Sequence, residues 1–181
     1  GIAGKISEKD IDEKAVKESR MIFLEGYLWD RGEPKLAFNK ALSLANKTAM
    51  SLSDQFCVER HKEDFLELVK NRLDITFANE QEIKSLISAK NFDEIITFGK
   101  QLNKTLIITR GAKGSVCMIN DEVFECEAKK NLKLIDLTGA GDLFASGFLH
   151  GHLNNLSTQQ SLEKGNEMSS KIIQKVGARL N

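Results

Sequence analysis

Apolar residues along this chain fall into short runs, separated by stretches in which they recur every three or four positions. The short runs, which are typical of buried strands, lie at residues 21–26, 49–53, 73–78 and 105–109. The helical spacing between them predicts helices that begin near Ser7, Pro34, His61, Asn79 and Asn91. Strands that alternate with helices of these lengths form a mostly parallel sheet flanked by helices. We therefore predict an α/β fold of the Rossmann-like kind.

The last third of the chain departs from this simple alternation. Residues 114–119 and 122–127 flank the pair Asn120–Asp121, which predicts an antiparallel hairpin with a two-residue turn. One more strand is expected at residues 132–136. After it, the pattern predicts helices at about 141–153 and 157–176, with no strand between them.

The composition favours one globular unit that recognises a small molecule. The chain has 181 residues with 41% hydrophobic content, which suits one domain over residues 1–181 better than two. Lys plus Arg number 26 and Asp plus Glu also number 26, so no net field attracts nucleic acid or an acidic membrane. A run of about 18 apolar residues, as a membrane span requires, is missing. We expect a cytoplasmic protein with a small-molecule partner; its oligomeric state stays open.

The cysteines and histidines give no sign of a disulfide framework or a zinc site. Cys57, Cys117 and Cys126 are odd in number and contain no C-x-x-C pair. In the predicted hairpin Cys117 would face Phe124 rather than Cys126, which argues against a disulfide there. The cysteines therefore suit a reducing compartment. The three histidines lack the spacing of a zinc-protease helix, so no structural zinc is expected.

Polar, glycine-containing loops follow three of the predicted strands. These loops come after Ala78, Thr109 and Asp136. In parallel sheets, ligands collect beyond the carboxyl ends of the strands, so these loops are the expected place of a functional site.

The third loop reads Gly139-Ala140-Gly141-Asp142 and leads into a helix. Two glycines around an alanine let the backbone bend sharply, which can aim successive amide N–H groups at one anion. The carboxylate of Asp142 could then accept a proton from an attacking hydroxyl, as phosphoryl transfer requires. Alternatively, the glycines only permit tight packing and Asp142 caps the helix. A dinucleotide loop fits less well, because its third glycine would fall on Phe144.

The other two loops are weaker signals. Thr109, Gly111 and Gly114 supply a hydroxyl and flexible backbone near which a nucleotide could lie, but they serve a hairpin entry equally well. Asn79 and Glu82 are three residues apart on one helical face and could reach a phosphate-bound Mg²⁺ through water. The same pair also suits a helix N-cap with an acidic first turn.

The order of these loops, with the run DLTGAGDLFASG at residues 136–147, resembles the ribokinase-like or PfkB family of carbohydrate kinases. The run matches the second signature motif of that family, and the likeness extends from about Met21 to Ala178. The resemblance implies a ribokinase-type fold and ATP-dependent transfer of a γ-phosphoryl group to a sugar or nucleoside hydroxyl, with Mg²⁺ bound to the phosphates.

The resemblance also implies roles for individual residues. It makes Asp142 the base that activates the acceptor hydroxyl, and it assigns the anion hole to the amides from Gly139 through Ala140 and Gly141 to Asp142. It places Asn79 and Glu82 near Mg²⁺ and phosphate. The remaining positions that it implies are nucleotide contacts at Thr109, Gly111, Gly114 and Asn166, and ligands of a monovalent cation such as K⁺ at Asp136 and Thr138.

Two further features bear on the acceptor. Residues 26–30 and 53–58 resemble a bacterial adenosine-kinase-like subgroup, which favours a nucleoside or ribosyl acceptor. Members of the family begin with a longer N-terminal half that carries a lid, and the chain begins with Gly1 without those motifs. We therefore expect this chain to be the C-terminal portion of a larger kinase. The alternative is a nucleotide-binding module or fragment without turnover.

Overall fold

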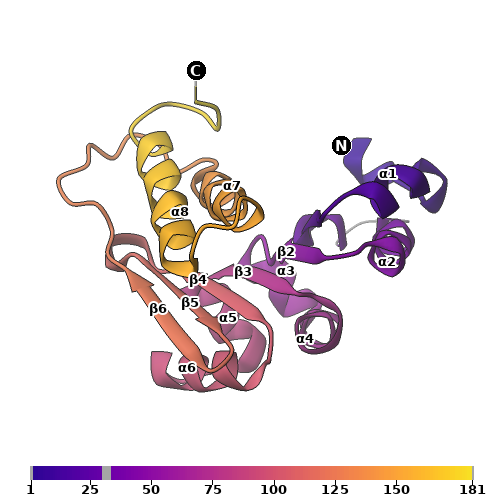
Figure 1. Ribbon diagram of the computed structural model, residues 1–181, viewed down its shortest axis with the longest axis horizontal. Coiled ribbons are helices and arrows are strands. Elements are labelled where there is room, and N and C mark those ends of the chain that lie inside the picture. Colours follow the sequence, from indigo (N-terminus) through magenta and orange to yellow (C-terminus); the bar gives the residue numbers. More distant parts are fainter. Residues whose placement is uncertain (1, 30–33, 181) are drawn as a thin grey trace.

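The computed structural model describes residues 2–29 and 34–180, and it contains a single six-stranded sheet (Figure 1). The strands lie in the order of the sequence, and β1 to β4 are parallel, whereas β5 and β6 are antiparallel. Their bounds are β1 Ile22–Glu25, β2 Thr48–Ser51, β3 Ile75–Asn79, β4 Thr105–Thr109, β5 Ser115–Ile119 and β6 Glu122–Cys126. The predicted α/β fold is confirmed, including the late hairpin.

Helices cover both faces of this sheet. The longer ones are α2 Pro34–Leu44, α5 Glu80–Ile87, α6 Phe92–Gln101, α7 Ala140–Leu153 and α8 Thr158–Ile172. The shorter ones are α1 Glu13–Glu18, α3 Gln55–Arg60 and α4 Lys62–Glu67, which continues as a π-helix over Leu68–Arg72. Helical turns of the 3₁₀ type lie at Ile2–Lys5, Glu8–Asp10, Gly26–Trp29 and Gly111–Lys113.

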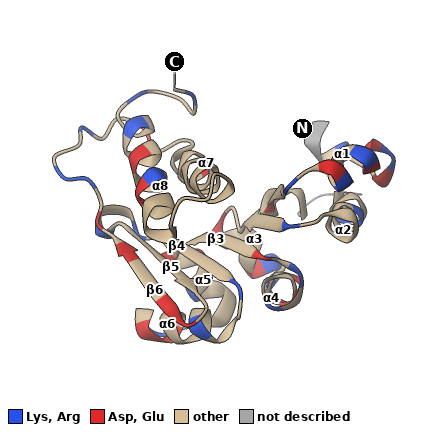
Figure 2. Cartoon of the chain, viewed as in Figure 1, with Lys and Arg blue, Asp and Glu red and all other residues tan. Residues whose placement is uncertain are grey.

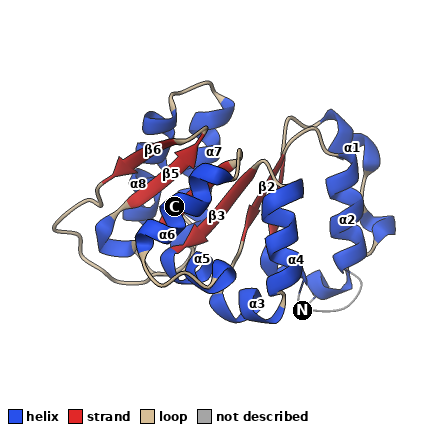
Figure 3. Cartoon of the chain, turned by 90° about the horizontal axis from the view of Figure 1, so that it is seen from below, coloured by secondary structure: helices blue, strands red, loops and turns tan. Residues whose placement is uncertain are grey.

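Alternate residues of the strands feed two cores. Met50, Leu106 and Ile108 face one side, where they pack with the buried side chains of α2 to α6. Ile75 and Ile107 face the other side, where they pack with α7 and α8. Figure 1 shows α7 and α8 on one face of the sheet and α5 and α6 on the opposite face, and Figure 3 shows the second face from below. The sheet is therefore covered on both sides, as parallel sheets normally are.

Glycines bring α7 and α8 unusually close together. A Cβ added at Gly147 would lie 2.6 Å from the Lys164 carbonyl oxygen, and one at Gly165 would lie 2.9 Å from the ring of Phe144. Larger residues at these positions would push the helices apart. This packing fixes the position of α7, whose first turn borders the candidate site described below.

Some sequence expectations were wrong. Residues 132–136 form no strand; Leu134 and Ile135 are exposed, and the amide of Ile135 donates to the carbonyl of Ile173 at 2.9 Å. An extended run becomes a strand only where a neighbouring strand offers its edge, and here the neighbour is the end of α8. The helix expected to begin near Ser7 divides into the turn at Glu8–Asp10 and the short α1.

The strand expected at residues 21–26 exists, but it is only half buried because it forms one edge of the sheet. In α2, Leu36 is exposed, whereas Phe38 and Leu42 are buried. Helix α3 was not predicted; its six residues are too few to show a clear periodicity.

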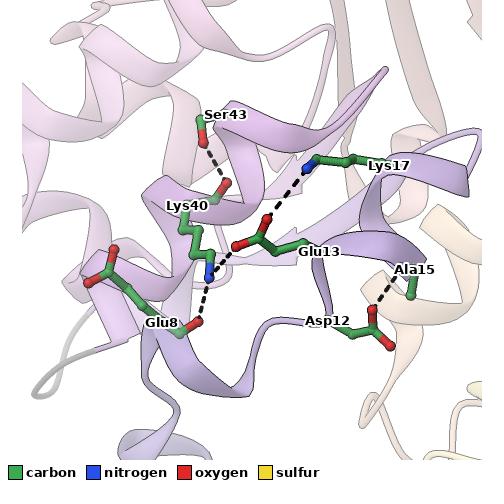
Figure 4. A network of polar contacts seen from close by, with 7 residues as sticks. All are labelled: Glu8, Asp12, Glu13, Ala15, Lys17, Lys40 and Ser43. Atoms are coloured by element: carbon green, nitrogen blue, oxygen red, sulfur yellow. Dashed lines mark hydrogen bonds and ion pairs between the residues drawn. The ribbon is translucent and has the colours of Figure 1, made fainter.

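Surface ion pairs hold the N-terminal segment against α2. Lys40 Nζ lies 2.9 Å from Glu13 Oε1 and donates to the carbonyl of Glu8 at 3.0 Å (Figure 4). The second carboxylate oxygen of Glu13 pairs with Lys17 at 3.4 Å. The bond from Lys40 lowers the pKa of Glu13, with Lys17 contributing. Exposed pairs of this kind stabilise weakly, so this corner depends more on the packing of α2.

Within residues 2–29 and 34–180, none of the helices reaches the length and hydrophobicity that crossing a lipid bilayer would require.

Candidate active site

A cavity of about 360 Å³ opens at the carboxyl ends of β1 to β4, beside the first turn of α7. Of the residues singled out from the sequence, it is lined by Asn79, Glu82, Thr109, Gly139, Ala140, Gly141 and Asp142. The sheet thus brings together groups that lie up to 63 positions apart in the sequence, from Asn79 to Asp142. This is the position at which parallel sheets usually bind ligands.

The first turn of α7 presents uncapped amides to this cavity. Its N-cap, Gly139, has no side chain to accept from them, and only the amide of Ala140 is used locally, donating to Leu137 O at 3.1 Å. Among the described residues, nothing accepts a hydrogen bond from the amides of Gly141 and Asp142. A Cβ added at Gly141 would meet no atom within 4 Å, so the space in front of this turn is open. Free amides at a helix start, with room before them, suit a phosphate.

The bend before α7 requires glycine at position 139. The φ angle of Gly139 is +77°, in the left-handed region that side chains disfavour. A Cβ there would also lie 2.8 Å from Cβ of Ala178, which belongs to the C-terminal segment. The sequence interpretation that this glycine permits a sharp turn therefore agrees with its backbone geometry.

Helix α5 begins at the same cavity, and a side chain already caps two of its first amides. Asn79 Oδ1 accepts from the amides of Gln81 at 2.9 Å and Glu82 at 2.8 Å. In return, the Glu82 carboxylate accepts from the backbone amide of Asn79 at 2.9 Å and from Asn79 Nδ2 at 2.6 Å. The two residues thus form a closed capping box, as the second reading of this loop predicted.

Glu82 is nevertheless an unusual carboxylate. Its side chain is buried although it lines the cavity. Burial, helped by the nearby charges of Asp54 and Glu25 and opposed by the bonds from Asn79, raises the pKa of Glu82 to about 7. Near neutral pH this group therefore exists in both protonation states.

Sequence reasoning did not identify several residues that line the cavity. Those at or just after the ends of β1 and β2 are Glu25, Tyr27, Ser51 and Ser53, and Phe77 lies in β3. Ser53 has a φ of +74° and donates its hydroxyl to Glu25 Oε2 at 3.0 Å, while its Oγ accepts from the amide of Tyr27 at 3.2 Å. Burial raises the pKa of Glu25, and the charge of Asp142 adds to this effect. The rule that pointed to the ends of β3 and β4 would have found them, had it been applied to the first two strands.

The residues of the second loop separate in the structure. Thr109 lies at the end of β4, next to Asn79 in the register of the sheet, and lines the cavity. Gly111 and Gly114 do not line it. Gly114, with a φ of +87°, allows the hairpin to close, since a Cβ there would collide with the carbonyl oxygen of Cys126. The hairpin itself therefore requires glycine at position 114.

Asn166 lies on α8, away from the cavity, and it ties this helix to the hairpin. Its Oδ1 accepts from the hydroxyl of Ser115 at 3.0 Å. Its Nδ2 donates to the carbonyls of Cys126 and Glu127, both at 3.2 Å. These bonds give Asn166 a structural role of its own, and a nucleotide contact at Asn166 stays a prediction.

Asp136 and Thr138 also lie outside the cavity lining. Asp136 accepts from the Thr138 amide at 2.9 Å and hydroxyl at 2.7 Å, and from the amide of Gly177 at 2.8 Å. These bonds, that of Gly177 first, lower the pKa of Asp136. They join the loop before α7 to the C-terminal segment, and the predicted cation role of the two residues stays a prediction.

The side chains that line the cavity determine how Mg²⁺ could be held there. Across the described chain, no three His, Cys, Asp or Glu side chains converge closely enough to hold a metal ion by themselves. Both carboxylate oxygens of Glu82 already accept a bond from Asn79 while facing the cavity. The residues present therefore fit a hydrated cation, held through water, better than one that has lost its water shell.

Known proteins share the sequence pattern and the fold of this chain. The model of the pfkB family of carbohydrate kinases matches residues 3–181. The chain belongs to this family. The resemblance read from the three loops is thus confirmed.

A 5-dehydro-2-deoxygluconokinase of Listeria monocytogenes is 25% identical over 181 residues, covering 94% of this chain and 55% of its own length. The crystal structure of the adenosine kinase from Sinorhizobium meliloti superposes with a TM-score of 0.94 at 34% identity, covering 98% of this chain and 56% of that one. An E. coli protein of ribokinase type in complex with ATP and Mg²⁺ has a TM-score of 0.86 at 21% identity, covering 97% and 59%, and shows the shared fold. The chain spans about half the length of these relatives.

Proposed function

We propose that these residues form the nucleotide-binding and catalytic portion of a larger kinase, which transfers the γ-phosphoryl group of ATP to a hydroxyl of a sugar or nucleoside. A nucleoside or ribosyl acceptor is favoured, in line with the adenosine kinase that this chain superposes on. The observation that carries the proposal is the first turn of α7, where free amides and the Asp142 carboxylate meet at one wall of a cavity.

The amides of Gly141 and Asp142 supply the electrostatic half of the reaction. They have no acceptor in the described part of the chain, and the space before Gly141 is open. Negative charge on the three oxygens of the transferred phosphoryl group would be stabilised by these N–H dipoles and by the N-terminal end of α7. Because the turn is already formed, little reorganisation is needed when that charge develops.

Asp142 supplies the other half. Its carboxylate accepts the proton of the acceptor hydroxyl as the oxygen of that hydroxyl attacks the γ-phosphorus and the bond to the β-phosphate oxygen breaks. The products are the phosphorylated acceptor, ADP and a proton that Asp142 returns to solvent. Position 142 suits this role, because it lies one residue from the open space at Gly141 and lines the same cavity.

Asn79, Glu82 and Thr109 line the same cavity from the ends of β3 and β4 and the first turn of α5, where the capping box keeps the polar groups of α5 fixed. Mg²⁺, when bound with the nucleotide, would neutralise phosphate charge, and Asn79 and Glu82 would hold it through water. The family of this chain and the E. coli relative that holds ATP and Mg²⁺ support ATP as the donor.

The test uses the intact polypeptide that carries this chain, incubated with ATP, Mg²⁺ and a panel of sugars and nucleosides. We expect ADP release that depends on one class of acceptor, with the phosphorylated product identified by mass spectrometry. If ADP release is the same with and without every acceptor, the proposal is wrong.

A second candidate is a nucleotide-binding module without turnover, which the chain's coverage of about half of each relative favours for these 181 residues alone. Titration of ATP into the 181-residue chain, followed by the ADP assay, separates the two. Nucleotide binding without acceptor-dependent ADP release would support the module.

A further inference from the structure

We propose that Ser53 is a positioning residue of the proposed reaction, whose hydroxyl holds the Glu25 carboxylate in the place where the phosphoryl acceptor meets it. This inference rests on the proposed kinase function and adds to it a residue that need not touch the reacting atoms. It is carried by the hydrogen bonds of Ser53 and by the backbone conformation that the residue adopts.

Ser53 joins three segments at the border of the cavity. Its hydroxyl donates to Glu25 Oε2 at 3.0 Å, and its Oγ accepts from the amide of Tyr27 at 3.2 Å. The Tyr27 hydroxyl donates to the carbonyl oxygen of Ser53, and the Ser53 amide donates to Ser51 Oγ, both at 3.2 Å. The Ser51 carbonyl oxygen lies 3.3 Å from the Ser53 hydroxyl, but the carboxylate is closer and is the stronger acceptor. Ser53 therefore ties the end of β2 to the end of β1 and to the turn that follows it.

The backbone of Ser53 adopts a conformation that side chains disfavour. Its φ is +74°, in the left-handed region. The other described residues with a positive φ are Gly, Asn or Asp, apart from Ser88 at the C-cap of α5. Asn and Asp tolerate this region better than serine does, and glycine adopts it without strain. The serine at position 53 is therefore explained by what its hydroxyl does rather than by its backbone.

The turn Gly26–Trp29, which follows β1, is also held by contacts that do not involve the Ser53 hydroxyl. A Cβ added at Gly26 would lie 2.8 Å from the carbonyl oxygen of Leu52, so the turn packs directly against the residue after β2. At the other end of the turn, Trp29 is buried and its Nε1 donates to Asp64 Oδ2 at 3.0 Å. Removal of the hydroxyl should therefore leave the turn in place and release mainly the carboxylate.

The surroundings of Glu25 make it depend on a fixed donor. Figure 2 shows Asp and Glu on outer elements such as α1, α6 and β6, where these residues are exposed, whereas Glu25 is half buried. Burial raises the pKa of Glu25, the bond from Ser53 lowers it, and the charge of Asp142 raises it. A half-buried carboxylate loses more than an exposed one when its hydrogen-bond donor is removed.

Glu25 is placed to meet an acceptor that reaches Asp142. Both residues line the same cavity, and the charge of Asp142 acts on Glu25. In the proposed reaction the attacking hydroxyl lies at Asp142, so the rest of the acceptor extends over other lining groups, among which Glu25 can accept from O–H groups. A group that orients a substrate must be held closely, because a displacement of about 1 Å can lower the rate about a hundredfold.

The test measures the Michaelis constants of both substrates in the intact protein, with the sugar, sugar acid or nucleoside that gives the highest kcat/KM in the wild type. Ser53→Ala removes the hydroxyl and keeps the strained backbone, whereas Ser53→Gly removes both. In each variant KM for the acceptor should rise about tenfold or more and KM for ATP should stay within about twofold, because the phosphates are assigned to the first turn of α7. A general loosening of the fold would change both constants.

Ser88→Gly is the matched control, because it relieves a positive φ at the exposed C-cap of α5, outside the cavity lining. It should leave both constants within about twofold of the wild type. Thermal unfolding checks the fold: the midpoint of Ser53→Gly should stay within about 5 °C of the wild type, since relief of the strain offsets the lost bond.

A double-mutant cycle tests whether Ser53 acts through Glu25. Glu25→Ala should itself raise KM for the acceptor, and adding Ser53→Ala should change it by no more than about twofold, since the hydroxyl then has no carboxylate to hold. The inference is overturned if both Ser53 variants keep the wild-type KM for the acceptor, if they raise both constants by the same factor, or if the effects of Ser53→Ala and Glu25→Ala multiply in the double variant.

Calorimetry with the same acceptor panel, in the absence of ATP, separates this inference from the kinase proposal. A compound that binds without ADP release counts against the kinase proposal alone, and its affinity should still fall about tenfold or more in Ser53→Gly. An affinity that does not fall, or a panel in which no compound binds or reacts, overturns the inference.

Discussion

Two helices begin at the same cavity, and they satisfy their first amides in opposite ways. Helix α5 is closed by its own side chains, because Asn79 accepts from two amides and Glu82 returns two bonds to Asn79. Helix α7 starts from Gly139, which has no side chain, and leaves the amides of Gly141 and Asp142 without an acceptor in the described chain. Both starts are rich in polar groups, but the second and third amides of the helix are capped by a side chain at α5 and left open at α7.

We infer from this difference that the start of α5 serves rigidity and that the start of α7 serves a ligand. The first amides of a helix are satisfied by a capping side chain such as Asn or Ser, by water or by a ligand. At α7 the cap is replaced by glycine and open space, so that water or a bound anion supplies the acceptor, at a cost of only about a few tenths of a kcal/mol relative to a capping side chain. The predictions below probe this contrast, from the largest expected effect to the smallest.

Asp142→Asn should have the largest effect. The amide side chain cannot accept the acceptor proton, so kcat should fall by about a hundredfold or more, while ATP affinity changes little because the backbone amides remain. Steady-state kinetics and ATP titration of the intact protein measure both quantities. Asp93→Asn, at an exposed position in the first turn of α6, is the control and should retain wild-type kinetics. Wild-type turnover in Asp142→Asn would remove this residue from the reaction.

The closed start of α5 should make stability depend on pH through Glu82. Its pKa is raised from 4.5 to about 7 in the fold, so between these values the folded protein binds a proton that the unfolded chain has lost. The free energy of unfolding should therefore fall as the pH rises from about 4.5 to 7, by at most about 3 kcal/mol from this group. Denaturant unfolding without nucleotide measures it.

In Glu82→Gln this pH-dependent component should disappear. Glu63→Gln, which changes an exposed carboxylate in the first turn of α4, is the control and should preserve it. A wild-type curve that matches that of Glu82→Gln across this range would show that burial does not perturb the carboxyl in the way described.

Gly141→Ala probes the open space in front of α7. Its methyl group would contact no protein atom within 4 Å, so the fold should tolerate it. The methyl group would nevertheless occupy the place assigned to a phosphate, and kcat/KM for ATP should fall about tenfold or more. Gly139→Ala should behave differently and lower the unfolding free energy by about 1 kcal/mol or more, since its φ is +77°.

Ser146→Ala changes an exposed position farther along α7 and serves as the control for Gly141→Ala. If Gly141→Ala retains full kcat/KM, the phosphate lies elsewhere.

Asn79→Ala should have the smallest effect. It opens the cap of α5 and removes a donor to Glu82, which should lower the unfolding free energy by about 1 kcal/mol. Asn91→Ala, which removes the cap of α6 away from the cavity, should cost a similar amount. A loss of nucleotide affinity in Asn79→Ala but not in Asn91→Ala would assign Asn79 to the ligand as well as to the helix.

Much of the fold could be predicted from local pattern, because most strands and helices here are buried on a regular period. The hairpin register, with Cys117 opposite Phe124, followed from the two-residue turn at Asn120 and Asp121, both of which have positive φ. The prediction of a strand at 132–136 was wrong, because strand pairing depends on a neighbouring strand in space, and a local apolar run does not reveal whether one is present. Helix α3 was missed because its boundaries depend on the cap at Asp54 rather than on periodicity.

The candidate site was predictable where a loop had its own signature. The turn at Gly139 to Asp142 and the pair Asn79 and Glu82 were identified because their spacing implies a geometry, and the structure brings both to one cavity. Glu25 and Ser53 have no such signature, and only the sheet order places them beside Asp142. Asn166 and Gly114 show the converse: a match in sequence to a nucleotide contact also satisfies a structural bond or a tight turn.

The most direct measurement is a crystal structure of the intact protein with a non-hydrolysable ATP analogue. We predict that an oxygen of the terminal phosphate lies within about 3.2 Å of the amide nitrogens of Gly141 and Asp142. A triphosphate bound away from the first turn of α7, or amides of that turn that donate to another protein group, would contradict the account.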